Sequence, residues 1–367
     1  MCEKTGKPVR DLFAANGRAF RRRFSALLVL LILINLFSCW PAMAEEAAEE
    51  NGDFSASPDG SFAEGLGFPM LTEDSFAVDD LPDGCLEACS QPGRVEKLTY
   101  TVSDGSGDKK YVMVYLPAGY DDSDTCYDIL YLLHAANGTP KNYLNSKKTT
   151  KFQCLLDNMI AEGSLKPLIV VAASYYTSEG ITGFMPLDQQ VVITSSFPRE
   201  LVEDIIPTVE SVLRTYAAAT DPDSIRASRD HRAVAGFSLG GVATWYVFLQ
   251  QMQAFRWFLP ISEGSWADEK GGTSGIWDSD VSAQVLYDAV LDQGFGKDDF
   301  RLFVATGTED EAFDISTSQM VSLLEYNDLF RLGENTGCSM MIGGTHTMDA
   351  LYTYLYHILP CLFLPQD

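Results

Sequence analysis

The stretch with the clearest capacity for chemistry is Gly-Phe-Ser-Leu-Gly-Gly, residues 236–241, which sets Ser238 between glycines. An apolar run of strand length precedes it, and a helical pattern follows it. A tight strand-to-helix turn lifts such a serine oxygen over the edge of a sheet and aims the next backbone amide at a bound carbonyl. The segment therefore predicts a nucleophile at Ser238 and an oxyanion donor at Leu239. The alternative is an ordinary glycine-rich turn.

A serine nucleophile needs a base, and the chain offers four histidines. His346 follows the last predicted strand and comes after the serine, which is the required chain order. His231 precedes the strand that leads to Ser238, so it belongs at the opposite end of the sheet. His134 comes too early in the chain, and His357 lies in an apolar helical pattern typical of packing. The spacing therefore predicts His346 as the base.

A carboxylate is needed to orient the imidazole and to stabilise its charged form. The loop after the penultimate predicted strand supplies four candidates, which are Glu309, Asp310, Glu311 and Asp314. In so acidic a chain the loop is also consistent with a solvated surface. The residues alone therefore leave the choice among these four open.

A second oxyanion donor is expected in the segment Leu-Leu-His-Ala-Ala-Asn-Gly, residues 132–138. Here a predicted strand ends in small residues, so the exposed amide of Ala135 or Ala136 is a candidate donor. His134 would then support the loop through its ring. A plain loop with small side chains is the alternative.

Residues 174–196 form a long connection between a predicted strand and a helix that is expected to begin at Pro198. Long connections of this kind are usually functional. Together with Trp266, Tyr175 and Tyr176 of this segment would wall a groove for an aromatic acyl group or a sugar. The alternative is that these aromatic rings pack the loop.

Short apolar runs alternate with longer helical patterns from residue 94 onwards. The first two runs, separated by a turn-rich segment, predict an antiparallel start. Six later runs are continuously apolar, as in strands that are buried on both faces of a parallel sheet. The pattern predicts an α/β fold with a mostly parallel sheet of about eight strands, covered by helices on both faces, in one domain over residues 91–367. The expected strands are 97–102, 110–117, 127–133, 167–173, 232–237, 257–262, 300–306 and 338–344.

The N-terminal region differs from the rest. Residues 1–44 have the layout of a secretory signal, with basic residues, then an apolar run, then Ala-Met-Ala. The alternatives are an uncleaved membrane anchor and a lipid-modified Cys39. Residues 45–90 carry thirteen carboxylates and no Lys or Arg, which predicts a disordered linker. The sequence therefore predicts a secreted or cell-surface protein.

The net charge limits the kinds of partner that the protein can bind, and the cysteine spacing limits the covalent links and metal sites that it can form. The chain has 26 basic and 51 acidic residues and a formal net charge of −25, which disfavours nucleic acid and anionic lipid. Membrane contact is expected only through the N-terminus. The six cysteines after residue 44 permit disulfides in an exported chain, and no spacing of Cys and His matches a zinc site. No metal or cofactor is predicted, and the oligomeric state is left open.

Several motifs in order resemble the secreted feruloyl and acetyl-xylan esterase family of α/β-hydrolases, from about residue 92 to the end of the chain. The resemblance implies an α/β-hydrolase fold with Ser238 as nucleophile and His346 as base. It implies Asp310 as the acid, because the family places its aspartate in a Gly-Thr-x-Asp turn. The motifs are VYLPAGYDDSDTCYDILYLLHAANG, LIVVAASYY, SRDHRAVAGFSLGGVATWY, LPISEGSW, VATGTEDEAF and GGTHTMDALYTYLYHILP.

Two residues depart from the family pattern. Ala135 stands where the family usually has a glycine directly after the loop histidine. Met348 stands where the family often has a tryptophan, two residues after the base. Both positions belong to the substrate side of the predicted site, so they bear on the acyl group more than on the mechanism.

These features together predict an exported serine esterase that acts through an acyl-enzyme on feruloyl or acetyl esters of plant-wall polysaccharide. The expected partner is thus a carbohydrate-linked ester. Two alternatives stay open. One is an acyltransferase of the same fold that passes the acyl group to a sugar. The other is a carbohydrate-binding surface protein whose hydrolase fold has lost turnover.

Overall fold

The computed structural model describes residues 78–180, 185–268 and 272–364. These residues belong to one unit of the chain, Ala63–Asp367. The predicted signal over residues 1–44 and most of the predicted linker lie outside the described residues. No helix in the described ranges is long and apolar enough to cross a membrane.

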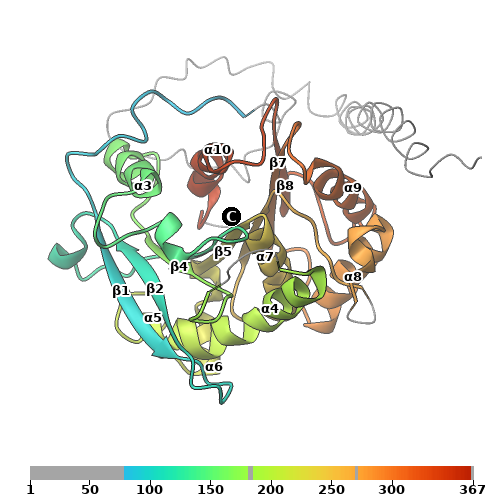
Figure 1. Ribbon diagram of the computed structural model, residues 1–367, viewed down its shortest axis with the longest axis horizontal. Helices are drawn as coiled ribbons and strands as arrows, with labels where there is room; N and C mark the ends of the chain where they lie inside the picture. The colour runs from blue at the N-terminus through green and yellow to red at the C-terminus, as the bar shows by residue number, and fades with distance from the viewer. Residues whose placement is uncertain (1–77, 181–184, 269–271, 365–367) are drawn as a thin grey trace, which may run out of the picture. The chain divides into compact units, whose positions relative to one another are not determined.

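In the described part of the chain, eight strands form one sheet (Figure 1). They are β1 (Arg94–Thr101), β2 (Lys109–Leu116), β3 (Ile129–Leu133), β4 (Ile169–Ala173), β5 (Arg232–Phe237), β6 (Trp257–Ile261), β7 (Arg301–Gly307) and β8 (Thr336–Met341). Their order across the sheet is β1-β2-β4-β3-β5-β6-β7-β8. β1 and β2 are antiparallel to their neighbours, and the six strands from β3 onwards run parallel. The predicted sheet and its antiparallel start are therefore confirmed.

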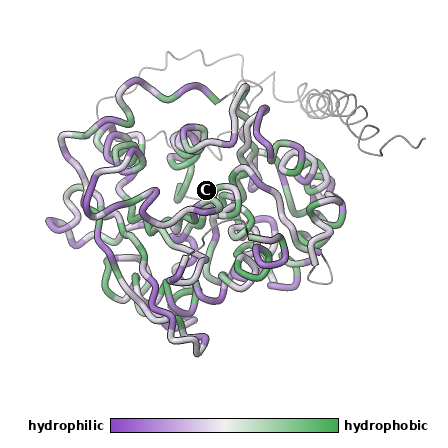
Figure 2. Tube along the Cα trace, in the orientation of Figure 1, coloured by the Kyte–Doolittle hydropathy of each residue, from purple (hydrophilic) through white to green (hydrophobic). Residues whose placement is uncertain are grey.

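Burial explains why the central strands read as unbroken apolar runs. Every residue of β3, β4, β5 and β6 is buried. In the antiparallel β1, exposed and buried positions are mixed. Figure 2 shows hydrophobic stretches in the middle of the trace and more hydrophilic ones in the outer loops. Strands covered on both faces need apolar side chains at most positions, which explains the continuous apolar runs of the sequence.

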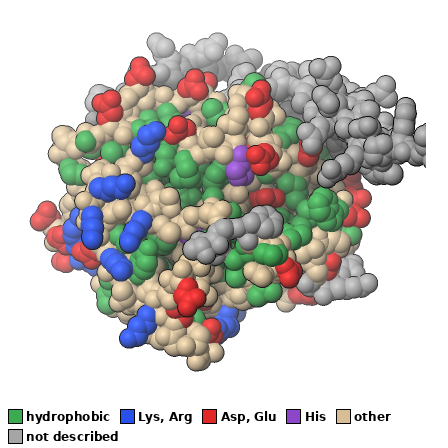
Figure 3. All heavy atoms as spheres, viewed as in Figure 1, with side chains coloured by type: hydrophobic (Ala, Val, Ile, Leu, Met, Phe, Trp, Pro, Cys, Tyr) green, Lys and Arg blue, Asp and Glu red, His purple; other side chains and the backbone are tan. Residues whose placement is uncertain are grey.

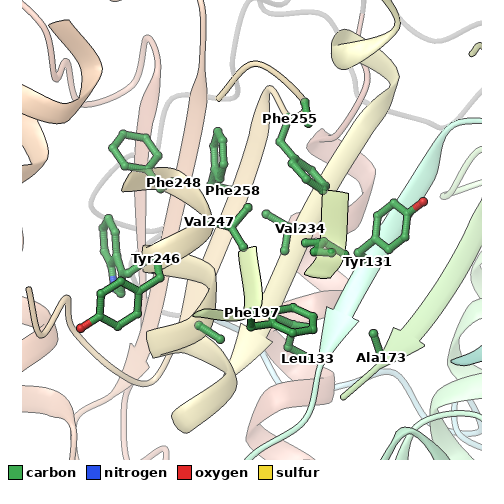
Figure 4. Packing of buried hydrophobic residues seen from close by; sticks show 14 of the residues in the cluster. Tyr131, Leu133, Ala173, Phe197, Val234, Tyr246, Val247, Phe248, Phe255 and Phe258 are labelled. Atoms are coloured by element: carbon green, nitrogen blue, oxygen red, sulfur yellow. The ribbon is translucent and has the colours of Figure 1, made fainter. Parts of the chain in front are cut away.

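Helices cover both faces of the sheet (Figure 1). They are α3 (Lys151–Glu162), α4 (Leu187–Glu200), α5 (Ile206–Glu210), α6 (Pro222–Ala227), α7 (Leu239–Gln250), α8 (Ser279–Asp292), α9 (Phe313–Leu324) and α10 (Met348–Ile358). Leu132 faces the core that α3 and α10 complete, and the next residue, Leu133, faces the core of α4 to α9. In the latter core, shown in Figure 4, Phe248 and Phe258 meet edge to face at 5.0 Å.

The segment 174–196, expected as a long connection, is partly helical. Helix α4 begins at Leu187 and continues through Pro198 to Glu200, and a π-helical turn then leads into α5. The expectation of a loop up to residue 196 was therefore wrong. A proline favours the first turn of a helix, which is why the sequence placed the helix start at Pro198. Here the proline lies in the helix interior, next to the irregular turn.

The segment that leads into β1 is held against α3 by hydrogen bonds. The sequence places the domain start at residue 91, yet residues from 78 onwards already lie against the domain. The amide of Gly93 donates to Oδ1 of the buried Asp157 at 2.7 Å. Asn158 Nδ2 donates to the carbonyl of Cys85 at 2.9 Å. Cys85 is a free thiol, as are the other five cysteines of the described residues.

A buried ion pair holds the start of β5, the strand that leads to Ser238. Arg232 Nε and Nη2 donate to the two oxygens of Glu210 at 2.7 and 2.9 Å, and both side chains are almost fully buried. The hydroxyls of Tyr131 and Thr215 donate to the same carboxylate at 2.8 and 3.1 Å. Both carboxylate oxygens are therefore satisfied, which a buried charge requires.

Arg232→Met should lower the free energy of unfolding by about 3–5 kcal/mol, because it leaves the Glu210 carboxylate buried without its partner. The double variant Arg232→Met/Glu210→Met should recover much of this loss, since neither charge remains. Urea denaturation followed by circular dichroism measures both effects. A double variant that is no more stable than the single one would contradict this account.

Candidate active site

Ser238 lies on a strained turn between β5 and α7. Its φ of 57° and ψ of −124° lie outside the ordinary strand and helix regions. Its amide donates to the carbonyl of Ile261, at the end of β6, at 2.9 Å. This bond ties the turn to the neighbouring strand. The serine is half-buried and directly precedes the first turn of α7, where backbone amides lack partners within the helix.

The turn depends on two close approaches of backbone to backbone. A Cβ atom at Gly236 would lie 2.0 Å from the carbonyl oxygen of Gly240. A Cβ atom at Gly240 would lie 2.5 Å from the carbonyl oxygen of Leu133. One of these oxygens belongs to the first turn of α7 and the other to the end of β3, so neither can move without disrupting the helix or the sheet, and both positions require glycine. The interpretation that small residues are needed on both sides of the serine is confirmed.

His346 and Asp310 meet at the carboxyl ends of β8 and β7. His346 Nδ1 lies 2.7 Å from Asp310 Oδ1, and the aspartate side chain is fully buried. The hydrogen bond to Asp310 raises the pKa of His346 above its ordinary value. Burial alone would raise the pKa of Asp310, but hydrogen bonds from His346 and from the Ala312 amide lower it. Asp310 thus stays ionised, and Nε2 of the imidazole is left to accept a proton.

The imidazole also contacts the turn that carries the serine. The His346 ring stacks on Phe237, the residue before Ser238, with centroids 4.7 Å apart. The loops of His346 and Asp310 are joined by a hydrogen bond from the Glu309 amide to the carbonyl of Gly344 at 3.0 Å. The predicted nucleophile, base and acid therefore follow strand ends at one edge of the sheet, where parallel sheets bind ligands.

The loop after β3 contains two backbone amides that were predicted as oxyanion donors. Among the described residues, no acceptor is found for the amides of Ala135 and Ala136. The amide of Gly138 closes the loop by donating to the carbonyl of Ala135 at 3.0 Å. Amides without partners at a strand end are what an oxyanion donor requires. The role of these amides stays a prediction.

His134 supports this loop through two hydrogen bonds of its ring. Its side chain is buried, with Nδ1 at 2.8 Å from the carbonyl of Ala135 and Nε2 at 2.8 Å from Ser174 Oγ. A carbonyl oxygen only accepts, so Nδ1 carries the hydrogen and Nε2 accepts from the serine. Burial lowers the pKa of His134 to about 4, so the ring stays neutral near pH 7. The structural role expected for His134 agrees with these contacts.

Tyr175 and Tyr176, predicted to wall a substrate groove, are buried and brace the same loop. The Tyr175 hydroxyl donates to the carbonyl of His134 at 2.7 Å. The Tyr176 hydroxyl accepts from the Asn137 amide at 3.0 Å. Their rings lie 4.6 and 5.0 Å from the His134 ring. These contacts favour the alternative in which both rings pack the loop over the one in which they wall a substrate groove.

Glu263 is a carboxylate of this region that the sequence analysis did not single out. It follows β6, and its Oε1 accepts from the Gly264 amide at 3.1 Å and from Trp266 Nε1 at 3.4 Å. Burial raises the pKa of Glu263, and the imidazole of His346 opposes that rise. The motif Leu-Pro-Ile-Ser-Glu ends a predicted strand, so the rule that selected the other loops would have found it.

The remaining predicted substrate-binding residues lie near these groups. Trp266 is buried and bonded to Glu263, and Met348 is half-buried as the first residue of α10. Their contact with a substrate stays a prediction. In the described ranges, no cluster of three or more His, Cys, Asp or Glu side chains could hold a metal ion.

Comparison with known sequences identifies related proteins. The family described as "Putative esterase" matches residues 103–326. Endo-1,4-beta-xylanase Y from Acetivibrio thermocellus is 33% identical over 287 residues, which cover 77% of this chain and 24% of that protein. An endo-1,4-beta-xylanase/feruloyl esterase from Xylanibacter ruminicola is 28% identical over 185 residues, which cover 48% and 23%. The chain thus spans about a quarter of the length of these relatives.

Comparison with solved structures also finds esterases. The feruloyl esterase module from Clostridium thermocellum, a serine-to-alanine mutant complexed with sinapinate, matches with a TM-score of 0.69 at 29% identity, covering 82% of this chain and 96% of that one. A ferulic acid esterase from the anaerobic fungus Anaeromyces mucronatus has a TM-score of 0.56 at 18% identity, covering 77% and 96%, and shows the fold alone. The protein is therefore an α/β-hydrolase. It belongs to the "Putative esterase" family, which confirms the predicted enzyme class and the resemblance to feruloyl esterases.

Glu263→Gln should lower the pKa of His346, because a neighbouring carboxylate favours the protonated imidazole and its removal takes that support away. Asp310 and Glu311 also face this ring, so a raised pKa should remain in part. NMR titration of the imidazole measures the shift. The control Glu309→Gln removes an exposed carboxylate from the loop of Asp310 and should leave the pKa unchanged. Equal behaviour of the two variants would contradict the assignment of Glu263 to the site.

Proposed function

We propose that the protein is a serine esterase that hydrolyses feruloyl or acetyl esters of plant-wall polysaccharide. The observation that carries the proposal is the 2.7 Å hydrogen bond between His346 and Asp310, next to the strained turn of Ser238. Membership of an esterase family supports the reaction class. The combination of a serine on a strained turn, a base and a buried acid is the arrangement that activates a hydroxyl for attack.

In the proposed reaction, Nε2 of His346 takes the proton of Ser238 Oγ while that oxygen attacks the ester carbonyl. Asp310 stabilises the imidazolium that forms. The amides of Leu239 and of the loop after β3 donate to the oxyanion of the tetrahedral intermediate. The imidazolium then passes its proton to the leaving alcohol, the ester C–O bond breaks, and the acyl group remains on the serine.

Water completes the cycle. It attacks the acyl-serine while His346 takes one of its protons, and a second oxyanion forms at the same amides. Collapse of this intermediate releases the carboxylic acid, and the proton returns to Ser238. The net reaction consumes one ester and one water and yields one acid and one alcohol.

The substrate class in this proposal is taken from the relatives. Their names include xylanase and feruloyl esterase activities, and the solved module from Clostridium thermocellum is complexed with sinapinate. An aromatic acyl group needs apolar surface beside the serine, and Trp266 and Met348 are the predicted residues that offer it. Export through the predicted signal in residues 1–44 belongs to the same proposal.

Ser238→Ala should reduce hydrolysis of methyl ferulate and of p-nitrophenyl acetate by about 10⁴-fold or more, because it removes the nucleophile. Rates are measured with purified protein, and thermal unfolding checks that the fold is intact. The matched control Ser196→Ala, on the exposed side of α4, should keep full activity. Substantial turnover by Ser238→Ala would overturn the proposed nucleophile.

The product distinguishes hydrolysis from transfer. With methyl ferulate and an added sugar acceptor, free ferulic acid should be the main product, identified by chromatography. A sugar ester as the main product would instead establish the acyltransferase alternative. A fluorophosphonate probe should label the wild-type protein and fail to label Ser238→Ala, which separates an active site from a fold that has lost turnover.

A further inference from the structure

A lysine-rich segment without carboxylates borders the candidate site. Residues 129–156 contain four lysines and no Asp or Glu, in a chain with 51 acidic and 26 basic residues. The segment runs from β3 through the loop of Ala135 and Ala136 into α3. It therefore includes the predicted oxyanion donors. Such a stretch is unusual in a chain this acidic, and the proposed reaction uses none of its lysines.

Two lysines share one aromatic ring at the surface. Nζ of Lys97 lies 4.4 Å from the centre of the Tyr111 ring, and Nζ of Lys141 lies 5.2 Å from it. Both lysines are exposed. The cation–π contacts hold two positive charges near one another. In the described part of the chain, neither lysine has a carboxylate within ion-pair distance. An anion bound between them would relieve their mutual repulsion.

Three more lysines, Lys147, Lys148 and Lys151, follow in the same segment. Lys147 and Lys148 are exposed and likewise lack an ion-pair partner among the described residues. Lys151 pairs with Asp349 at 3.1 Å, and Asp349 lies three residues after His346. This contact joins the lysine segment to the loop of the base. The exposed, unpaired lysines 97, 141, 147 and 148 are called the lysine strip below.

The distribution of charge on the surface sets the strip apart. Figure 3 shows several Lys and Arg side chains on the side of β1, β2 and α3, with Asp and Glu side chains among them, and apolar side chains between this group and the histidine that is visible on this face. Elsewhere in the domain, Lys297 and Arg331 each lie within 3.2 Å of a carboxylate. Charges that are neutralised locally attract no ligand, whereas the strip keeps its full charge.

We propose that the lysine strip binds carboxylate groups of an acidic polysaccharide, one that carries uronic acid units, while its ester group lies at Ser238. The inference rests on the proposed function, because it assumes that the ester is cleaved there. Ammonium groups spread along a surface match a polymer with repeated carboxylates better than a single small anion. The net charge of −25 repels such a polymer elsewhere on the protein, so the strip also orients it.

The test compares binding with turnover of a small neutral ester. The variant Lys97→Gln/Lys141→Gln/Lys147→Gln/Lys148→Gln should bind polygalacturonate about tenfold more weakly than the wild type at low salt, by affinity electrophoresis. Binding by the wild type should weaken as salt is added. The kcat/KM for methyl ferulate should stay within about twofold, because no strip residue takes part in the proposed reaction.

A control variant removes the same number of positive charges away from the strip. Its substitutions are Arg199→Gln, Arg226→Gln, Lys297→Gln and Arg331→Gln. It should bind polygalacturonate like the wild type, and equal losses in both variants would overturn the proposal. The proposal would also be overturned if the wild-type protein did not bind polygalacturonate, or if it bound neutral arabinoxylan equally well. Stronger binding to phosphatidylglycerol vesicles than to polygalacturonate would overturn it as well. Failure of the wild type to hydrolyse methyl ferulate would count against the proposed function instead.

Discussion

The close packing of α7 against the ends of β3 and β6 is the constraint on which the site depends. The left-handed φ of 57° at Ser238 costs on the order of 1–3 kcal/mol. Burial of one large apolar side chain contributes about 1.5–3 kcal/mol, and α7 buries Trp245 and Phe248 among others. Packing of the helix therefore outweighs the strain. Glycine at positions 236 and 240 is what lets the helix come close enough.

Two kinds of charge act at different depths around this turn. Asp310 is buried and hydrogen-bonded to His346, so it has the largest effect on the pKa of the imidazole, and Glu311 and Glu263 raise that pKa by smaller amounts. The lysine strip is exposed, where water and salt screen each charge and a single contact is worth little. A buried carboxylate therefore acts alone, whereas the strip has to act as a group. This difference explains how a protein of net charge −25 combines a negative interior site with a positive surface beside it.

The fold could be predicted because buried parallel strands leave an unbroken apolar signal, and all eight strands were found. The start of α4 was missed, because Pro198 in a helix interior reads as a helix start. At the site, chain order was enough to select His346. It could not select Asp310, because in an acidic loop only the contact with the imidazole separates one carboxylate from its neighbours. The bracing of the loop by Tyr175 is a long-range contact, which no local pattern records.

Ala135, which stands where the family usually has glycine, has an ordinary backbone conformation. Ala135 is not among the described residues with positive φ, so the chain does not need glycine at that position. Glycine is required at position 138 instead, where a Cβ atom would lie 2.8 Å from the carbonyl oxygen of Ala135. The side chains of Ala135 and Met348 both pack against the core that α3 and α10 complete. Both departures thus lie on one side of the candidate site, next to α10, and the alanine at position 135 introduces no strained backbone.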